Sequence, residues 1–217
     1  MQIGVLGGTG AAGSAVSARL AAVGVEVVLG SRTEERAAEA VDEITKRWTG
    51  YDLTLVPATN QVAAQADLVV LATPVEGAVN TVGGLVDELS GKILVTMVNA
   101  MVRWGDRVVP LLPYTGSVAV ALSRVIPATH VAGAFHHLPA GPLGDPSYEP
   151  EADVMVFSDV PSVTDEVIRV VGLIPGLHGV DVGGLGSALA VEALTACLVE
   201  INRRYKTHAS LRVTGIV

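Results

Sequence analysis

The sequence Gln2-Ile3-Gly4-Val5-Leu6-Gly7-Gly8-Thr9-Gly10-Ala11-Ala12-Gly13 decides the fold. Its apolar first part predicts a buried strand, and residues 8–13 fit the pattern G-x-G-x-x-G where a helix should begin. The first glycine permits a tight turn, the second lets the backbone approach a pyrophosphate, and the third lets the helix pack against the strand. The free N–H groups at the start of the helix would attract the anion. We therefore predict a dinucleotide-binding turn; the alternative is a strand-to-helix turn with incidental glycines.

Strand and helix patterns alternate along the first half of the chain. The expected strands lie at 2–6, 26–29, 53–56, 68–71 and 93–96, and the expected helices at 11–23, 33–48 and 76–89. The helix at 33–48 has Thr33 as a candidate N-cap, and Glu34 and Glu35 suit the positive end of its dipole. This alternation implies a parallel sheet with right-handed crossovers.

The second half of the chain continues the pattern less regularly. We expect helices at 116–125, 162–171 and 186–204, and strands at 131–135, 153–157 and 178–182 that extend the same sheet. The sequence thus predicts an α/β fold, a doubly wound Rossmann-type parallel sheet extended by extra strands, with a small C-terminal helical part. A boundary near Gly183-Gly184 would separate a nucleotide-binding domain, residues 1–182, from a helical segment, residues 183–217.

Composition excludes several classes of protein. The 217 residues suit one domain of ordinary size. A net charge of −8 with 4% aromatic residues argues against nucleic acid, which needs basic tracks and stacking platforms. The single cysteine excludes an internal disulfide and a cysteine-based zinc cage. No apolar run reaches the roughly 18 residues of a membrane span, and the start has no basic region typical of a signal peptide. We therefore expect a cytoplasmic protein.

The end of the second expected strand indicates which dinucleotide is bound. Binding sites for NAD usually carry Asp or Glu there to hold the ribose 2′-hydroxyl, but this strand ends in Gly30-Ser31-Arg32. A guanidinium forks onto phosphate oxygens and a serine donates one more bond, so these residues suit the 2′-phosphate of NADP. Arg36 lies one helical turn further and could face the same anion; alternatively it pairs with Glu39 or Glu35.

With these residues in place, nearly the whole chain resembles the NADPH-dependent reductases of the deazaflavin coenzyme F420. The motifs that carry the resemblance are Gly7-Gly8-Thr9-Gly10, Gly30-Ser31-Arg32 with Arg36, Thr73-Pro74 with Glu76, the loop His136 to Ala140 with Pro139, and Val191-Glu192-Ala193-Leu194-Thr195. The glycine motif is common to many dinucleotide enzymes, whereas the later motifs, in this order, are more specific. The resemblance implies an oxidoreductase that transfers a hydride between NADPH and F420.

The resemblance also implies a set of binding residues. The NADP pyrophosphate would be lined by Thr9, Gly10, Ala11 and Ala12, and the 2′-phosphate would be held by Ser31, Arg32 and Arg36. Thr73 would lie near the adenosine and pyrophosphate, Asn99 and Ala140 near the nicotinamide, and Ser210 near the deazaflavin. The chain departs from the family in its small Ala11-Ala12 and in the polar Asn99 after an apolar segment.

Direct transfer of a hydride to a carbon needs orientation rather than a side-chain acid or base. This agrees with the absence of a nucleophile-and-base pair or a metal motif, so we expect no catalytic side chain and no metal. Neighbouring His136 and His137 would point to opposite faces of an extended segment; a loop histidine could touch the deazaflavin ring or be structural. The coenzyme's anionic tail could meet basic residues, or these are ordinary solvated charges: Arg103, Arg107, Arg203, Arg204 and Lys206.

Other features have less specific interpretations. Cys197 lies among apolar residues of an expected buried helix and should be an inert core thiol, and Trp48 and Trp104 should be packing residues. The small residues of 186–192 could form a homodimer seam or pack on the protein's own sheet, and we expect a homodimer.

Two other functions compete with F420 reduction. An NADP-dependent reductase of a small imine or a ferric chelate would usually add a long helical domain, but only about 34 residues follow Gly183. A non-catalytic NADP sensor would bind the nucleotide without turnover.

Overall fold

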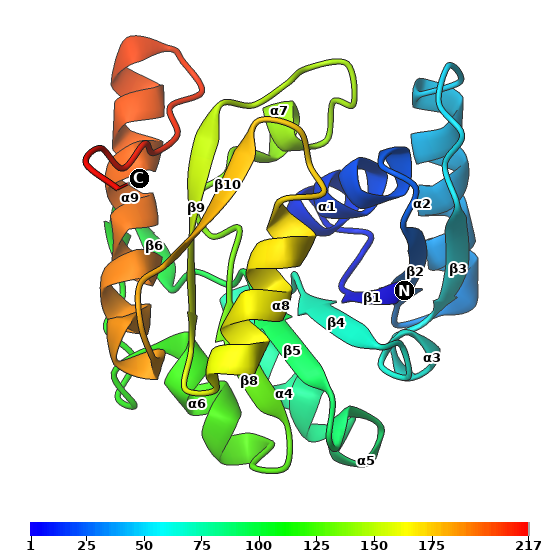
Figure 1. Ribbon diagram of the computed structural model, residues 1–217, viewed down its shortest axis with the longest axis horizontal. Coiled ribbons are helices and arrows are strands. Elements are labelled where there is room, and N and C mark those ends of the chain that lie inside the picture. Colours follow the sequence, from blue (N-terminus) through cyan, green and yellow to red (C-terminus); the bar gives the residue numbers. More distant parts are fainter. Residues whose placement is uncertain (217) are drawn as a thin grey trace.

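The structure is a computed structural model that describes residues 1–216, and its centre is a sheet of eight strands (Figure 1). The strand order is β10-β9-β8-β5-β4-β1-β2-β3. The bounds are β1 Gln2–Leu6, β2 Glu26–Ser31, β3 Leu55–Thr59, β4 Leu68–Leu71, β5 Ile93–Thr96, β8 His130–Gly133, β9 Ala152–Ser158 and β10 Leu177–Asp181. The central six strands, from β3 to β8, are parallel, which confirms the predicted Rossmann-type fold.

The added strands extend this sheet in the opposite direction. Strand β9 runs antiparallel to β8, and β10 runs parallel to β9. The expectation of a parallel sheet is therefore wrong at this edge. After β8 the chain stays at the carboxyl edge in the segment 134–151 and enters β9 from there, without a crossover to the opposite edge of the sheet.

Helices cover both faces of the sheet. They are α1 Ala11–Ala22, α2 Glu34–Arg47, α3 Asn60–Ala63, α4 Val75–Gly83, α5 Val86–Leu89, α6 Val118–Val125, α7 Ala140–Leu143, α8 Pro161–Val171 and α9 Ala188–Tyr205. Strand β4 shows why both faces need cover: Leu68 and Val70 join a core with α1 and α8, whereas Val69 and Leu71 join a second core with α4 and α6.

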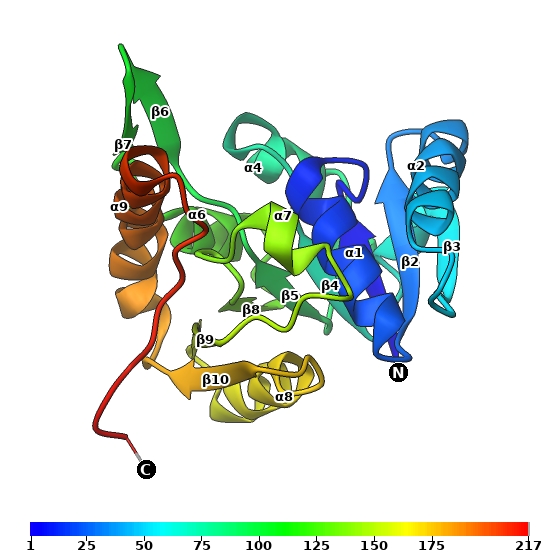
Figure 2. The same ribbon diagram turned by 90° about the horizontal axis from the view of Figure 1, so that it is seen from above.

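Four segments differ from the sequence-based expectation. The helix expected at 76–89 is divided into α4 and α5 around Gly84-Leu85. Residues 101–110 form an antiparallel hairpin of β6, Met101–Trp104, and β7, Arg107–Pro110, which stands beside α9 (Figure 2). The short helices α3 and α7 were also missed. A four-residue helix has no apolar period that a sequence pattern could reveal.

Within the described part of the chain, one helical segment, Leu185–Tyr205, is long and apolar enough to cross a membrane, with a hydropathy of 1.4. This is weak evidence, because core helices of soluble proteins meet the same criterion. Here α9 buries Ala188 and Val191 in the second core. The buried Glu192 carboxylate accepts hydrogen bonds from the backbone N–H groups of Val118 (2.9 Å) and Ala119 (3.0 Å) at the start of α6. The helix is thus joined to the globular fold by its inner face.

Candidate functional site

The turn between β1 and α1 has the geometry expected for an anion-binding site. Gly7 has a φ of +77°, which favours glycine. A Cβ on Gly13 would lie 2.8 Å from Gly8 Cα and closer still to the Gly7 carbonyl oxygen, so helix and strand meet backbone to backbone. The N-cap Gly10 is extended and offers no side-chain cap, so the first N–H groups of α1 are left for a ligand. The strand–turn–helix predicted from the sequence is therefore present.

A cavity of about 450 Å³ opens beside this turn at the carboxyl ends of β1, β2 and β4. Six of the predicted site residues line it, namely Thr9, Gly10, Ser31, Arg32, Arg36 and Thr73. No Asp or Glu lines it among the described residues. Neither Arg32 nor Arg36 forms an ion pair within the described chain, so the alternative pairing of Arg36 with Glu39 or Glu35 does not occur there. Both guanidinium groups are available to an anionic ligand.

Asn60 lines the same cavity and was missed by the sequence analysis. Its Oδ1 accepts a hydrogen bond from the Gly7 backbone N–H (3.2 Å), so Asn60 stabilises the glycine turn. It begins α3, a helix too short to be recognised from the sequence. Thr73 also faces the cavity, and its buried hydroxyl has no hydrogen-bond partner among residues 1–216. Unsatisfied buried polar atoms of this kind are expected where a ligand binds.

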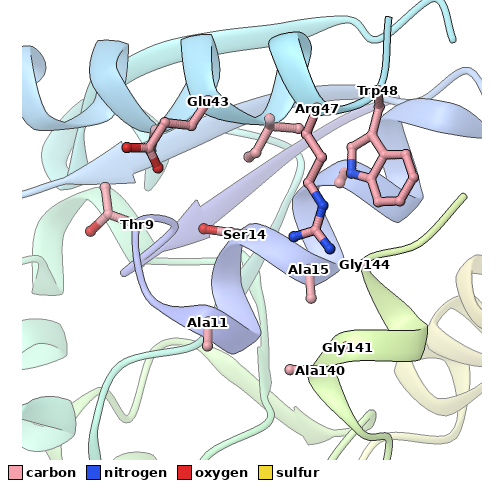
Figure 3. Close-up of a pocket in the computed structure, with 13 residues that line it drawn as sticks. Thr9, Ala11, Ser14, Ala15, Glu43, Arg47, Trp48, Ala140, Gly141 and Gly144 are labelled. Carbon is pink, nitrogen blue, oxygen red and sulfur yellow. The ribbon is translucent and has the colours of Figure 1, made fainter. Parts of the chain in front are cut away.

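A second cavity, of about 320 Å³, lies between α1, α2 and α7 (Figure 3). Thr9 lines both cavities, and Ala11 faces Ala140 and Gly141 across the second one. Residues far apart in the chain, Ala11 and Ala140, thus line one cavity, whereas Ala11 does not line the first cavity, where Thr9 and Gly10 lie. Ala12 lines neither cavity and packs instead against the first core.

The carbonyl of His136 joins three elements. It accepts hydrogen bonds from Asn99 Nδ2 (2.9 Å), which follows β5, and from Thr195 Oγ1 (3.1 Å) on α9. Asn99 Oδ1 is buried and has no hydrogen-bond partner in the described part of the chain, so it can accept a hydrogen bond from a ligand. The sequence analysis assigned no role to Thr195 beyond its motif, because this contact depends on the tertiary fold.

The two neighbouring histidines are both buried and contact different groups. The His136 ring stacks on Phe157 with centroids 5.5 Å apart, and burial lowers its pKa to about 3. The His137 Nε2 lies 2.8 Å from the Asp153 carbonyl oxygen, and burial lowers its pKa as well. Among the described residues, no group of three or more His, Cys, Asp or Glu side chains could hold a metal ion. Because both rings are buried, we favour a structural role for the two histidines over contact with the deazaflavin ring.

The remaining predicted residues lie further from the two cavities. Ser210 is exposed on the C-terminal tail, where its Oγ lies 3.4 Å from the Glu151 carbonyl, beside the loop that carries Pro139. The core assignments of Cys197 and Trp104 are wrong: Cys197 is exposed on α9, and Trp104 is 77% exposed on the hairpin. Trp48 is partly buried and packs as predicted.

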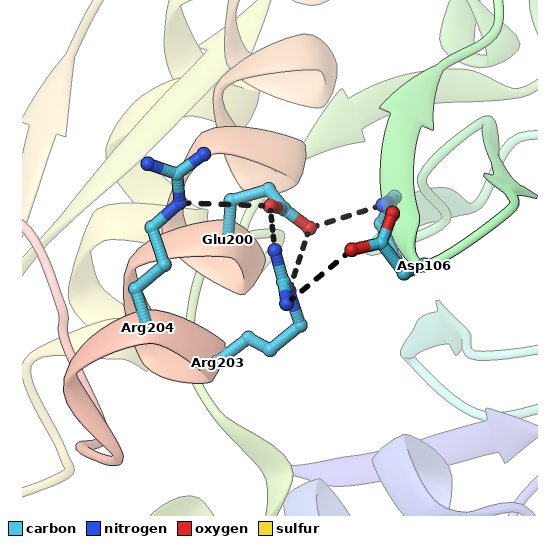
Figure 4. A network of polar contacts seen from close by, with 5 residues as sticks. Asp106, Glu200, Arg203 and Arg204 are labelled. Carbon is cyan, nitrogen blue, oxygen red and sulfur yellow. Dashed lines mark hydrogen bonds and ion pairs between the residues drawn. The ribbon is translucent and has the colours of Figure 1, made fainter.

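A network of charges joins the hairpin to α9 (Figure 4). Glu200 Oε1 accepts a hydrogen bond from the Val108 N–H (3.1 Å), and its Oε2 lies 2.9 Å from Arg203 NH2. Arg203 also approaches Asp106 (3.9 Å), and Arg204 approaches Glu200 (3.9 Å). The hydrogen bond from Arg203 lowers the pKa of Glu200. Arg203 and Arg204 therefore balance Glu200, whereas Arg103, Arg107 and Lys206 form no ion pair among the described residues.

Comparisons with known proteins agree with this geometry. Residues 2–100 match the family model for coenzyme F420-dependent NADP oxidoreductases. The F420-dependent NADP reductases of Methanothermobacter marburgensis and Methanocaldococcus jannaschii are 31% and 32% identical to the chain, over 100% of it and 99% of each relative.

Solved structures show the same fold. A putative F420-dependent NADP-reductase from Arthrobacter sp. FB24 superposes with a TM-score of 0.84 at 22% identity, covering 99% of this chain and 100% of that one. The pyrroline carboxylate reductase of Plasmodium falciparum gives a TM-score of 0.55 at 13% identity, covering 83% of this chain and 57% of that longer one. From the full-length identity to the methanogen enzymes, the chain belongs to the family of F420-dependent NADP reductases.

Proposed function

We propose that this protein transfers a hydride between NADPH and the oxidised deazaflavin coenzyme F420, in either direction. Support comes from the family and from one structural observation. The cavity beside the glycine turn combines Ser31, Arg32 and Arg36 with no carboxylate, and it shares Thr9 with the second cavity, which Ala140 lines. A dinucleotide phosphate site and a second cavity, which we propose as the ring site, therefore adjoin.

In this proposal each residue of the first cavity has a binding role. The N–H groups of Thr9, Ala11 and Ala12 bind the pyrophosphate at the positive end of α1, while the Gly10 N–H closes the turn on the Gly7 carbonyl (3.1 Å). Arg32 and Arg36 bind the 2′-phosphate by charge-assisted hydrogen bonds, and the Ser31 hydroxyl, which is 4% exposed, donates one more. Thr73, whose hydroxyl lacks a hydrogen-bond partner among the described residues, contacts the adenosine and pyrophosphate side.

In this proposal the residues of the ring site position the nicotinamide and deazaflavin rings and take no chemical part in the reaction. When bound, the nicotinamide supplies or accepts the hydride and the deazaflavin is its partner. Asn99 is held by the His136 carbonyl and offers its free Oδ1 to the nicotinamide side, where Ala140 leaves space for a flat ring. No acid or base is needed, and the buried His136 stays neutral near pH 7 because its pKa is about 3. Rate enhancement then comes mainly from orientation and exclusion of water.

The division of the chain follows the same scheme. We assign NADP binding to residues 1–182 and a contribution to the deazaflavin site to residues 183–217, including Ser210 on the tail. Ser210 lines a small pocket with Leu138 and Pro139, next to the loop that leads to Ala140. Since both reaction partners are soluble cofactors, a cytoplasmic location suits this function.

We also infer that the protein is a homodimer that pairs through α9 and the hairpin. Half of the sixteen exposed large hydrophobic residues among the described ones lie on α9, on the hairpin or on the segment that directly follows the hairpin: Val102, Trp104, Leu111, Leu112, Tyr114, Leu189, Ile201 and Tyr205. An open groove of about 430 Å³ separates β7 from α9. A two-fold axis through one such surface buries it on both copies at once. The seam lies on the outer face of α9, because the inner face, with Ala188 and Val191, already packs on the protein's own core.

Mixing the purified protein with NADPH and oxidised F420 tests the function. We expect the visible absorbance of the deazaflavin to decrease with a matching loss of NADPH. NADPH binding without bleaching would favour the sensor. Oxidation of NADPH by a small imine or a ferric chelate, but not by F420, would favour the alternative reductase.

A further inference from the structure

Arg19 is a buried cation on the nucleotide-binding helix. The residue is 3% exposed and forms no ion pair within the described chain. Burial lowers the pKa of its guanidinium, and the charge of Asp145 opposes this effect. Because an arginine stays protonated in proteins, a charge is kept inside the fold at a desolvation cost. Such a group needs an explanation beyond its contribution to packing.

The partners of Arg19 are backbone carbonyls from one short segment. Its Nε donates to Leu143 O (2.8 Å), and the two hydrogens of its Nη2 are shared among Pro142 O (2.9 Å), Tyr148 O (2.8 Å) and Asp145 O. Pro142 and Leu143 are the last residues of α7, where helix carbonyls have no partner of their own. One side chain of α1 therefore caps α7 and holds the segment that follows it.

Helix α7 depends on this support. It has four residues, and its own hydrogen bonds are Leu143 N–H to Pro139 O (3.0 Å) and Gly144 N–H to Ala140 O (2.9 Å). A single turn fixes too many dihedral angles for its few bonds to persist alone. The buried Leu143 side chain adds an apolar contact. The guanidinium provides the polar part of the attachment to α1.

The attachment of α7 to α1 sets the width of the second cavity. A Cβ on Gly144 would lie 3.0 Å from Ala15 Cα, so the end of α7 touches the backbone of α1 (Figure 3). Ala11 and Ala15 form one wall of the second cavity, and Ala140 and Gly141 form the facing wall. Arg19 lies on the same helix, one turn beyond Ala15, and ties the two walls together.

We propose that Arg19 is a positioning residue for hydride transfer, which holds α7 against α1 and so fixes the separation between the nicotinamide side and the acceptor ring. This inference rests on the proposed function. Its planar fork is what the site uses, because Nε and Nη2 donate from two different nitrogens to carbonyls spread over residues 142–148, whereas lysine has all its donors on one atom.

The test compares Arg19→Lys and Arg19→Met with wild type and with Arg169→Met. Arg169 is exposed on α8 and pairs with Glu166, so its variant controls for loss of a charge. We expect NADPH affinity, measured by fluorescence titration, to stay within about threefold, because the 2′-phosphate and pyrophosphate residues are untouched. The single-turnover rate with both cofactors saturating should fall at least about tenfold, because misplacement by a fraction of an ångström slows a reaction that depends on orientation.

Two further measurements separate positioning from simple stability. Amide hydrogen exchange of residues 140–149 should accelerate in both Arg19 variants while α1 stays protected. In Arg19→Ala, ethylguanidinium should restore part of the transfer rate and the isosteric ethylurea should not, since Arg19 borders an open groove of about 220 Å³ with Tyr51 and Ser147. Unchanged exchange, an unchanged saturated rate, or equal losses of rate and NADPH affinity would overturn the proposal. If wild type transfers no hydride to F420, the proposed function fails together with the positioning role, whereas the exchange data still decide whether Arg19 holds α7.

Discussion

Replacing Arg32 by alanine should change the choice of cofactor and leave the fold intact. Arg32 stands at the carboxyl end of β2 and lines the cavity with Ser31 and Arg36. It is exposed and forms no ion pair within the described chain, so its removal costs the free protein little. The loss is confined to the complex with a ligand that carries the 2′-phosphate.

The expected loss of kcat/KM for NADPH follows from the exposure of Arg32 to solvent. A hydrogen bond to a charged group contributes about 1.5–3 kcal/mol, and solvent around Arg32 favours the lower end. About 1.5 kcal/mol corresponds to about a tenfold loss in kcat/KM for NADPH. NADH lacks the phosphate, so its kcat/KM should stay the same or rise.

Steady-state kinetics with both nucleotides measures this selectivity directly. Arg47→Ala is a matched control: Arg47 lies on α2, the helix that follows Arg32, but lines the second cavity and stacks over Trp48, 5.0 Å from the ring centroid. Equal losses for NADPH and NADH in Arg32→Ala would refute the assignment of the 2′-phosphate. A loss of NADPH selectivity in Arg47→Ala as large as that in Arg32→Ala would refute the location of the phosphate in the first cavity.

Three further changes test other parts of the structure. Gly13→Ala places a Cβ 2.8 Å from Gly8 Cα, so the turn must shift, and the melting temperature and its increase on adding NADPH should both fall. His136 has a pKa depressed to about 3, so it stabilises the fold above its unfolded pKa and less as pH falls; between pH 6.5 and 5.5 the loss from His136 is about 1 kcal/mol in urea unfolding, and His136→Phe should remove this part and leave the part due to His137, whose pKa burial also lowers. Cys197 is the only cysteine and is exposed on α9, so a short bis-maleimide should yield a covalent dimer on denaturing gels.

Each of these three has a control and an opposing outcome. Gly50→Ala adds a Cβ with no neighbour within 4 Å, and a Gly13→Ala protein that keeps its NADPH response would contradict the close packing. His178→Gln changes an exposed histidine, and an acid sensitivity as large in His136→Phe as in wild type would assign the effect to another group. Pairing through α9 would be contradicted by cross-linking that continues after the protein is diluted below the dissociation constant of the dimer. It would also be contradicted by a lack of cross-linking at every protein concentration.

The sequence alone determined the nucleotide half of the molecule, because its signals are local. Glycines at 8, 10 and 13 belong to one turn, Ser31 and Arg32 are adjacent, and Arg36 lies one helical turn away. Spacing along the chain therefore predicts which residues share the cavity. The capping role of Thr33 is local in the same way: its Oγ1 accepts from the Arg36 N–H at 3.5 Å, as the sequence predicted.

Tertiary structure alone decided the ring side of the site and the outer surface. The meeting of Asn99, His136 and Thr195 joins residues up to 96 positions apart, and the bonds from Arg19 to residues 142–148 span more than 120. No periodicity encodes such contacts, because they depend on how the segment 134–151 returns to the sheet at its carboxyl edge. For the same reason, Cys197 looked like a core residue: an apolar helix shows its composition in the sequence, whereas the packing of its neighbours decides which face is covered.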